Sequence, residues 1–436
     1  MRFGTDGVRG RANTELTPAF ALDLGRAAAQ VLGAEQAVVG GDSRLSTPML
    51  EAAFVAGLSS EGVEVHRLGV TPTPAVAFEA ARLGAMGAVI SASHNPYHDN
   101  GIKLFAVGGT KLPDEVESRI ESALGSLGDP SGEPAHIHGR GASADGYVDH
   151  LLSVLGGRHL TGLRVVVDAA NGAASHLAAD VMGRTGAQVS VVNAEPDGTN
   201  INAGCGATEP AGLQSTVRAE RADVGIALDG DADRLIAVDE RGEVVDGDHI
   251  IAICATDLRD CGLLHDDTVV VTVMTNLGFR LAMEAADIDV IETPVGDRYV
   301  LEALGRGAYS LGGEQSGHVI FTRHATTGDG LLTALVLLDI VQRSGTPLSE
   351  LASAAMTQLP QVLLNVPVAE RRPDISEVLA DDIETWRHEL GHTGRVLVRP
   401  SGTEPLVRIM VEAPTSELAG RVAASLRDSL LRRIGA

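Results

Sequence analysis

The sequence predicts an α/β protein: three similar α/β/α domains with mixed, mostly parallel sheets, and a smaller α+β C-terminal domain, all around one central cleft. Three observations lead to this fold class. A strand–helix–strand pattern recurs three times along the chain, each copy ends in a different polar loop, and the last part of the chain departs from the pattern. The copies share little residue identity, so the prediction depends on the rhythm of strands and turns.

Each copy is interpreted as a strand, a helical stretch, a second strand, a further helical stretch or turn, and a third strand that ends in the loop. The first strands are expected at Ala37–Val39, Leu163–Val167 and Thr268–Val273, and the second strands at Val63–Leu68, Gln188–Asn193 and Ile288–Ile291. The loops are Ser91–Pro96, Asp229–Arg234 and Gly313–His318. Ligands bind beyond the carboxyl ends of strands in open parallel sheets, so we expect these loops to form one composite site.

The same pattern sets the expected domain boundaries, which are residues 1–142, 143–246, 247–360 and 361–436. A stretch rich in Gly, Ser and Pro, Gly125–Gly141, is interpreted as a linker, and Pro360–Pro367 as a hinge before the last domain. The last domain is expected to contain strands at Arg395–Val398 and Leu406–Val411 and an amphipathic helix at Ser416–Arg433.

Composition and charge exclude several classes of protein. The chain has 436 residues, of which 44% are hydrophobic, as in globular proteins, and no uninterrupted apolar run reaches the ~18 residues of a membrane span. The net charge of −24 argues against nucleic acid and anionic membranes as partners. The first residues contain no apolar signal core, and the three cysteines have no metal-site spacing, so we expect a cytoplasmic protein with reduced thiols.

The loop of the second copy carries three aspartates at alternating positions, Asp229, Asp231 and Asp233, directly after an apolar strand. In an extended chain alternate side chains share one face, so the three carboxylates are expected to converge. Three negative charges at such short distances repel each other unless a cation lies between them, and hard oxygen ligands suit Mg²⁺. A solvated turn is the structural alternative.

The aspartate loop is similar in spacing to two other aspartate-rich motifs. A calcium EF-hand loop has similar spacing, including Glu240 at its twelfth position, but Arg234 stands where that loop needs glycine. The haloacid-dehalogenase phosphatases begin with a similar strand and Asp-x-Asp, but they need a later lysine, and no lysine follows Lys111. The sequence therefore fits neither motif.

The loop of the first copy offers a serine, Ser93, beside His94, with Lys103 close in sequence. Such a serine could be a nucleophile or a phosphate carrier, or the loop could be a plain turn. A hydrolytic Ser–His pair is less favoured because no Gly-x-Ser-x-Gly elbow surrounds Ser93. The magnesium site on the next domain favours phosphate chemistry. Of 34 basic residues only Lys103 and Lys111 are lysines, which favours a role for a compact ammonium group near this loop.

Two further loops suggest how a substrate is held. Between the two strands of the last domain, Ser401, Gly402 and Thr403 lie between Arg399 and Arg408. Backbone N–H groups in such a turn form an anion nest and guanidinium groups grip phosphate, so this loop is interpreted as an anchor for a phosphate that does not react.

The loop of the third copy contains Glu314, Gln315 and Ser316 between glycines. These hydrogen-bonding groups suit sugar hydroxyls, although a simple polar turn explains the composition equally well.

Together, Ser-Ala-Ser-His-Asn-Pro, Asp-Gly-Asp-Ala-Asp-Arg and Arg-Pro-Ser-Gly-Thr-Glu-Pro resemble the α-D-phosphohexomutase superfamily over essentially the whole chain. The opening Phe3–Gly10 and the loop Gly-Glu-Gln-Ser-Gly-His are similar to the bacterial phosphoglucosamine mutases within it. The resemblance implies an isomerase that interconverts glucosamine 6-phosphate and glucosamine 1-phosphate, toward UDP-N-acetylglucosamine and the cell wall. It further implies a phosphoserine at Ser93, a 1,6-bisphosphate intermediate, and glucosamine or glucose 1,6-bisphosphate as activator.

The resemblance also implies roles for individual residues. One Mg²⁺ per chain would be held by Ser93, through its phosphate, and by the three aspartates. Lys103, His94 and His318 become the candidate acid and base, while Arg9 and Arg234 add positive charge near the phosphoserine. Glu314, Gln315 and Ser316 would bind the sugar, and the arginines and Ser401–Thr403 its phosphate. A homodimer formed through domain one is also expected.

Two alternative functions remain open at this point. One is a phosphomannomutase/phosphoglucomutase of broad specificity. The other is a sugar-phosphate sensor without catalysis, which the serine, the aspartates and the lysine oppose, because a pure binder does not need a phosphate carrier.

Overall fold

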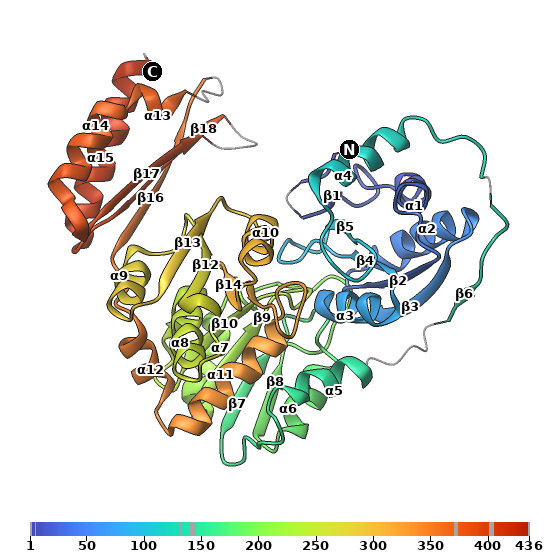
Figure 1. Ribbon diagram of the computed structural model, residues 1–436, viewed down its shortest axis with the longest axis horizontal. Coiled ribbons are helices and arrows are strands. Elements are labelled where there is room, and N and C mark those ends of the chain that lie inside the picture. Colours follow the sequence, from blue (N-terminus) through green and yellow to red (C-terminus); the bar gives the residue numbers. More distant parts are fainter. Residues whose placement is uncertain are drawn as a thin grey trace. The chain divides into compact units, whose positions relative to one another are not determined.

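The computed structural model of the protein describes residues 2–4, 6–130, 132–139, 145–369, 374–400 and 405–434 (Figure 1). They form two compact units. The first comprises Met1–Met274 and Asp287–Ala355, and the second comprises Thr275–Ala286 and Met356–Ala436. The first unit contains three sheets and the second unit a fourth. The predicted fold class, three α/β domains followed by a smaller α+β domain, is confirmed.

The first sheet has six strands in the order β1–β5–β4–β2–β3–β6. Its parallel core is β4, β2 and β3, to which β6 adds a short parallel edge, and β5 and β1 are antiparallel. The strands are β1 (Val8–Arg11), β2 (Gln36–Gly41), β3 (Glu64–Val70), β4 (Met86–Ile90), β5 (Asp99–Phe105) and β6 (Ile137–His138). Because β6 lies inside the stretch interpreted as a linker, the part of that stretch that is described is tied to the sheet edge.

Both faces of the first sheet are covered, as the unbroken burial of β2 and β4 requires. Val39 packs into a core with α1 (Pro18–Leu32), α2 (Thr47–Ser60) and α4 (Asp114–Leu124). The next residue back, Val38, faces the opposite side and packs with α3 (Thr73–Leu83). Alternating side chains of one strand therefore hold the two helical layers that Figure 1 shows around this sheet.

The second and third sheets repeat the central strand order of the first. The orders are β5–β4–β2–β3, β10–β9–β7–β8 and β15–β14–β12–β13, so the three copies share one topology. The strands of the second sheet are β7 (Arg164–Asp168), β8 (Gln188–Val192), β9 (Val224–Leu228), β10 (Leu235–Asp239) and β11 (Val244–Val245). Those of the third are β12 (Thr268–Thr272), β13 (Asp289–Thr293), β14 (Leu311–Gly313) and β15 (Val319–Phe321).

The sequence interpretation did not include the antiparallel strand that follows each polar loop, namely β5, β10 and β15. Each loop is therefore the turn between two antiparallel strands, with both of its ends held by hydrogen bonds of the sheet. The remaining helices of the first unit are α5 (Asp145–Ser153), α6 (Ala178–Arg184), α7 (Ala211–Glu220), α8 (Gly247–Asp260), α10 (Asp297–Gly307), α11 (Gly330–Ser344) and α12 (Leu348–Ala355).

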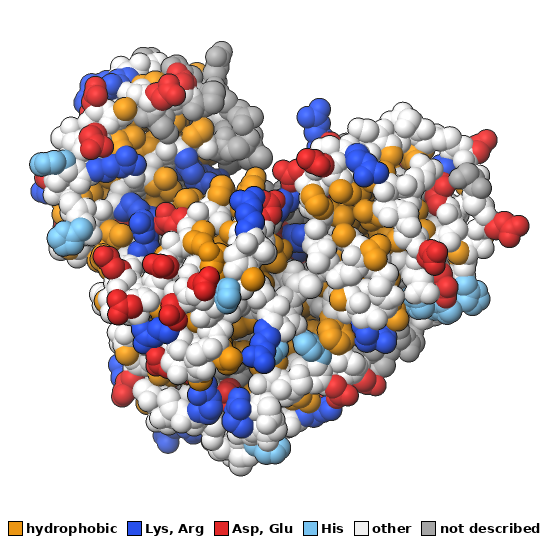
Figure 2. Space-filling model, in the orientation of Figure 1, with side chains coloured by type: hydrophobic (Ala, Val, Ile, Leu, Met, Phe, Trp, Pro, Cys, Tyr) orange, Lys and Arg blue, Asp and Glu red, His pale blue; other side chains and the backbone are white. Residues whose placement is uncertain are grey.

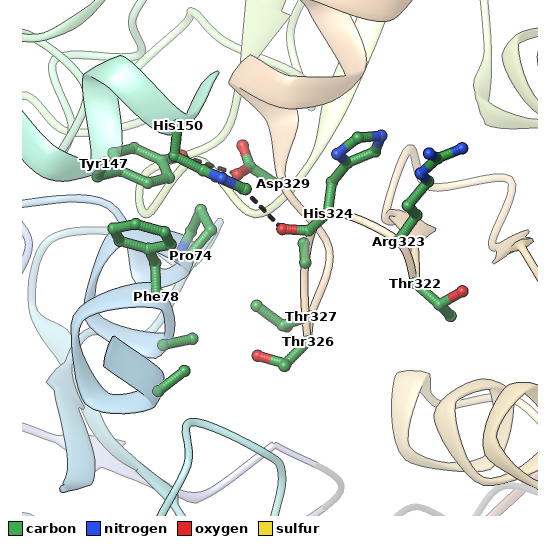
Figure 3. Close-up of a pocket in the computed structure, with 13 residues that line it drawn as sticks. Pro74, Phe78, Tyr147, His150, Thr322, Arg323, His324, Thr326, Thr327 and Asp329 are labelled. Carbon is green, nitrogen blue, oxygen red and sulfur yellow. Dashed lines mark hydrogen bonds between the residues drawn. The ribbon is translucent and has the colours of Figure 1, made fainter. Parts of the chain in front are cut away.

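A pocket of about 220 Å³ lies where α3 and α5 meet the segment that follows β15 (Figure 3). The Tyr147 hydroxyl donates to Asp329 at 2.9 Å, and His150 Nε2 lies 2.7 Å from the His324 carbonyl oxygen. These two contacts join the second and third α/β copies, and α3 of the first copy lines the same pocket. None of the residues that line this pocket belongs to the three polar loops, so it is distinct from the site described below.

The second unit is a three-stranded antiparallel sheet in the order β16–β18–β17, covered by helices. Its elements are β16 (Gln361–Pro367), β17 (Arg395–Pro400), β18 (Leu406–Glu412), α9 (Leu277–Ala285), α13 (Ile375–Val378), α14 (Ala380–Leu390) and α15 (Ser416–Ile434). The interpretation of Pro360–Pro367 as a hinge is wrong, because β16 pairs with β18 along its whole length. The prolines that suggested a break lie only at the ends of that segment, where a strand tolerates them.

Among the described residues, no single helix is long and apolar enough to cross a membrane, although the bent pair of α11 and α12 meets that test of length and composition when the two are taken together.

Candidate active site

Ser93 lies in the turn between β4 and β5, in a conformation that the rest of the fold enforces. Its backbone φ is +51°, in the left-handed region, and its side chain is buried. The carbonyl oxygen of Ser93 accepts hydrogen bonds from Arg44 Nη2 and from Asn202 Nδ2, each at 2.9 Å. The same Arg44 guanidinium also donates to the carbonyl oxygens of Asn95 and Pro96. One buried cation therefore fixes most of the loop backbone.

A second layer of polar groups holds the start of this loop. The Ser93 N–H donates to Ser91 Oγ at 2.9 Å, and the Ser91 hydroxyl donates to Asp42 at 2.6 Å. Asp42 also forms a fully buried ion pair with Arg44 at 2.8 Å. Asp42 and Arg44 follow β2, so two neighbouring strands of the first sheet share the support of Ser93.

The hydroxyl of Ser93 points at the acidic loop of the second sheet. Ser93 Oγ donates to Asp229 Oδ2 at 2.5 Å, and His94 Nδ1 lies 3.4 Å from the same hydroxyl. The two loops approach closely because Gly230 has no side chain: a Cβ there would lie 2.5 Å from the Ser93 carbonyl oxygen. The predicted convergence of these two loops is thus present in the structure.

The acidic loop is a turn and not an extended segment, which corrects the reasoning from alternating side chains. Ala232 has a φ of +56°, and the turn brings the three aspartates together by curling around. One oxygen from each of Asp229, Asp231 and Asp233 lies within 4.8 Å of the other two. The convergence predicted for these carboxylates is therefore present, although a different backbone geometry produces it.

The buried carboxylates fit a hard divalent cation such as Mg²⁺. Among the described residues, Asp231 Oδ1 and Asp233 Oδ1 are buried without a hydrogen-bond partner, which is costly unless another ligand satisfies them. Burial, with the negative charges of Asp233 and Asp231, raises the pKa of Asp229 well above its usual range. A cation near these oxygens would satisfy the unpaired acceptors and offset the repulsion between the carboxylates, and the all-oxygen donor set suits Mg²⁺.

Lys103 on β5 supplies one positive charge to this cluster. Its Nζ lies 2.7 Å from Asp231, 2.7 Å from Asp6 and 3.0 Å from Asp233. Burial alone would lower the pKa of Lys103, but Asp231, Asp233 and Asp6 raise it well above its usual range. Lys103 is therefore a charged donor in this state and does not fit the role of a base.

Lys111 and Asp6 extend the network toward the third sheet. Lys111 Nζ contacts Asp6 at 2.5 Å and also pairs with Asp297 at the start of α10. Burial raises the pKa of Asp6, but Lys103, Lys111 and Arg9 together hold it well below its usual range. Arg9, which was predicted to add positive charge near Ser93, lies 2.7 Å from Asp6 and forms an ion pair with this carboxylate.

The two candidate histidines differ in environment. Burial, followed by the charges of Arg234 and Arg9, lowers the pKa of His94 to about 4, so His94 is neutral near pH 7. His318 is buried, with Nδ1 3.6 Å from Asp233 and Nε2 accepting from the Gly328 N–H at 3.1 Å. Burial lowers the pKa of His318, but Asp233 raises it to above its usual value overall. In the neutral ring the proton is therefore on Nδ1, toward Asp233.

The loop of the third sheet offers fewer free groups than its composition suggests. Glu314 Oε1 accepts from the Gly296 N–H at 3.1 Å, and Gln315 Nε2 donates to Asp246 at 3.3 Å. Asp246 is the N-cap of α8, so Gln315 supports a helix terminus. Ser316 is exposed.

In the second unit, two arginines face each other across neighbouring strands. Arg399 on β17 is the direct partner of Arg408 on β18, and Arg408 Nε is buried without a hydrogen-bond partner among the described residues. Burial and the charge of Arg408 lower the pKa of Arg399. Like charges directly opposite destabilise a sheet, so the pair stays a candidate for binding an anion. Ser401, Gly402 and Thr403 lie outside the described residues.

Several residues of this network were not found from the sequence. Asp6 stands in the opening motif Phe3–Gly10 without a predicted role, and no role was predicted for Arg44, Asn202 or Asp297. The Asp-Ser-Arg sequence after β2 was the available clue for Arg44, because it follows a strand end of the same sheet as Ser93.

Four family models match the chain in order. Their descriptions are "Phosphoglucomutase/phosphomannomutase, alpha/beta/alpha domain I" at residues 1–128, domain II at 145–242, domain III at 246–359, and the C-terminal domain at 363–429.

The chain is also similar to individual proteins along its full length. It is 54% identical over 440 residues to the "Phosphoglucosamine mutase" of Rhodococcus opacus, covering 98% of each chain. A crystal structure of a phosphoglucomutase/phosphomannomutase family protein from Burkholderia thailandensis aligns with a TM-score of 0.81 at 25% identity, covering 98% of this chain and 97% of that one. The N-acetylphosphoglucosamine mutase of Aspergillus fumigatus, solved with GlcNAc-6P and magnesium, shares the fold at a TM-score of 0.71 and 19% identity, covering 100% and 96%.

Proposed function

Because the chain belongs to the phosphoglucomutase/phosphomannomutase family, we propose that it is an isomerase that interconverts glucosamine 6-phosphate and glucosamine 1-phosphate. The observation that carries this proposal is the Ser93 hydroxyl, held 2.5 Å from Asp229 at the edge of a buried acidic cluster. The choice of the amino sugar is supported by the 54% identity to the Rhodococcus opacus phosphoglucosamine mutase.

In the proposed reaction, Ser93 carries a phosphoryl group and gives it to the free hydroxyl of the sugar phosphate. The bond between Ser93 Oγ and phosphorus breaks, a bond from the sugar oxygen to phosphorus forms, and the hydroxyl proton leaves to a base. The product is a 1,6-bisphosphate, which reverses its orientation. Ser93 Oγ then attacks the other phosphate, so the serine is phosphorylated again and the isomeric monophosphate is released.

The residues around Ser93 have complementary roles in this transfer. Arg44 and Asn202 fix the serine backbone, so the phosphoryl group is presented in one direction. Lys103 places a fixed positive charge beside the acidic cluster, with its three N–H groups facing Asp231, Asp6 and Asp233. His318 is a candidate acid or base because it lies against Asp233 of the acidic cluster, and accepting a proton at Nε2 requires its hydrogen bond with the Gly328 N–H to open.

Mg²⁺, held by Asp229, Asp231, Asp233 and the phosphate on Ser93, would offset the charge of the phosphoryl group and make phosphorus more electrophilic. The aspartates favour binding of the ion because they are buried and because, among the described residues, Asp231 Oδ1 and Asp233 Oδ1 have no hydrogen-bond partner. On the substrate side, we propose that the loop of Glu314, Gln315 and Ser316 binds the sugar. The Arg399 and Arg408 pair binds a phosphate group of the substrate.

The test is the transfer of radiolabel from labelled glucose 1,6-bisphosphate to the protein in the presence of Mg²⁺, with the labelled peptide identified by mass spectrometry. We expect label on Ser93, and Ser93→Ala to lose both labelling and mutase turnover by about 10³-fold or more. Ser215→Ala, which changes an exposed serine on α7, is the matched control. Label on another residue, or normal turnover by Ser93→Ala, would remove the proposed mechanism.

A further inference from the structure

A group of histidines lies at the open edge of the first sheet, where β2 separates β3 and β6 from β4, the strand that leads into the serine loop. The strands β3 and β6 pair in parallel there, with His66 opposite His138. Alternate side chains of a strand share a face, so Glu64 and His66 on β3 lie on the same side as His136 and His138 beside them. Figure 2 shows histidine and acidic side chains gathered on the surface near the position of β6 in Figure 1.

These side chains already contact one another. His138 Nε2 lies 2.5 Å from Glu64 Oε1, and the His66 and His138 rings are stacked with centroids 4.6 Å apart. The His136 ring meets the edge of His138 at 4.8 Å. One ligand atom from each of Glu64, His66 and His138 lies within 4.8 Å of the other two. The backbone thus presents two imidazoles and a carboxylate to a single point.

One atom of the group is without a partner. Among the described residues, His66 Nε2 is buried and accepts or donates no hydrogen bond. Burial, followed by the charge of His138, lowers the pKa of His66, which favours the neutral imidazole that binds metals. A buried and unsatisfied imidazole nitrogen beside a carboxylate is a group that an ion could satisfy.

We propose that Glu64, His66 and His138 form a binding site for a divalent transition-metal ion such as Zn²⁺, with His136 as the neighbouring fourth ligand. Two imidazoles and one carboxylate are a common protein ligand set for Zn²⁺. Such nitrogen ligands favour transition metals, whereas the all-oxygen aspartate cluster favours Mg²⁺. The two sites therefore select different ions.

Binding requires a small rearrangement of the rings. A metal lies near the plane of each imidazole that binds it, but the His66 and His138 planes are nearly parallel, at 6° to each other. At least one ring must turn about its Cβ–Cγ bond. The side chains of His138 and Glu64 are 40% and 38% exposed, so they can turn without losing a packed environment.

The site would fasten a long connection to the sheet. The segment between α4 and β6 is held at its end by two backbone hydrogen bonds, from Val65 N–H to the His136 carbonyl oxygen at 2.9 Å and from Ala135 N–H to the Ser59 carbonyl oxygen at 3.0 Å. The strand β6 contains only the residues Ile137–His138. A metal bridge between β3 and β6 would add a cross-link where the pairing is shortest.

The test uses the full chain in excess Mg²⁺, which occupies the aspartate cluster, titrated with Zn²⁺ by calorimetry and with Co²⁺ by visible absorption. We expect one Zn²⁺ per chain, and a Co²⁺ spectrum typical of nitrogen ligation. The double variant His66→Ala/His138→Ala should raise the Kd for Zn²⁺ at least tenfold. Glu64→Gln should weaken binding less.

His388→Ala, which removes an exposed histidine on α14, serves as the control and should leave Zn²⁺ binding unchanged. Circular dichroism of each variant checks the fold. The proposal is overturned if the wild type and the double variant bind Zn²⁺ with equal affinity. It is also overturned if the wild type binds no Zn²⁺ at concentrations up to about 1 mM.

Discussion

Arg44 is the residue on which the geometry of the serine loop most depends. It lies fully buried, pairs with Asp42, and donates to three loop carbonyl groups, those of Ser93, Asn95 and Pro96. A planar guanidinium with five donors can satisfy so many acceptors at once, whereas an ammonium on a flexible stem cannot. The strained φ of Ser93 persists because this network determines the loop from several sides.

We therefore predict that Arg44→Lys lowers the free energy of unfolding by about 3 kcal/mol, because buried carbonyl groups and Asp42 lose partners. Turnover should also fall by about tenfold or more, since Ser93 would be less well oriented. Urea denaturation and steady-state kinetics measure the two effects. Arg184→Lys, at an exposed ion pair with Asp149, is the control and should change stability by less than about 1 kcal/mol. Full activity in Arg44→Lys would show that the loop does not need this support.

At this scale, the sequence was sufficient for residues that stand in contiguous motifs. The three aspartates and Ser93 were identified because each loop directly follows an apolar strand. Arg44 and Asn202 were not identified, because their roles consist of contacts with Ser93. Arg44 lies 49 positions from Ser93 in the chain, and Asn202 lies 109 positions from it. Such long-range contacts leave no local pattern in a single sequence.

The strand pair β17 and β18 shows a conflict between stability and binding at the scale of an element. Arg399 and Arg408 are direct cross-strand partners, and an opposed pair of like charges costs about 0.2–1 kcal/mol. A sheet gains nothing from this arrangement unless an anion lies between the guanidinium groups.

We predict opposite effects on stability and binding for Arg408→Met, which keeps an apolar stem and removes the charge. The free energy of unfolding should stay the same or rise by about 0.5 kcal/mol, while KM for glucosamine 6-phosphate rises about tenfold. Arg427→Met, at an exposed ion pair on α15, is the matched control. If Arg408→Met destabilises the protein and leaves KM unchanged, the arginine pair is structural.

The start of α11 carries a second testable feature, the N-cap Asp329. Burial raises its pKa to about 6, although the Leu332 N–H and the Tyr147 hydroxyl donate to it. Its unfolded pKa is about 3.9. The folded state thus binds a proton more tightly than the unfolded state, so the stabilising contribution is complete below about pH 4 and is lost as the pH rises toward 6 and above.

We therefore expect the wild type to lose about 3 kcal/mol of stability relative to Asp329→Asn between pH 4 and pH 7. Urea denaturation of both proteins across this range measures the difference. Asp180→Asn, which changes an exposed carboxylate, gives the background slope. A pH-independent difference between wild type and Asp329→Asn would show that the carboxyl group is ionised throughout.

At the element scale, the apolar strands of the parallel cores were predictable because both faces of each are buried. The strands β5, β10 and β15 were not predicted, because the polar turn before each of them was interpreted as a functional loop and not as the start of a hairpin. The strand β16 was mistaken for a hinge because its ends carry proline. In each case the segment forms a strand because it hydrogen-bonds to another strand of its sheet, a contact that the local sequence does not show.

For the whole molecule, three copies of one topology each place a polar turn between antiparallel strands at the same position of the sheet. In the first unit, this arrangement joins Ser93 of the first copy to Asp229 of the second and, through Asp233, to His318 of the third. The rhythm of strands predicted that the loops would meet. The two lysines indicated positive charge near the serine loop, but the sequence did not show that Lys103 and Lys111 pair with Asp6, which decides how the cluster is neutralised.

The measurement that tests the central claim most directly is turnover of the full chain with Mg²⁺ and a trace of sugar 1,6-bisphosphate, followed by phosphorus NMR. Glucosamine, glucose and mannose 6-phosphates are compared. We predict a kcat/KM for glucosamine 6-phosphate at least tenfold above the other two, which corresponds to about 1.4 kcal/mol in the barrier. Equal values for the three sugars would contradict the assigned substrate, and no turnover on any of them would contradict catalysis itself.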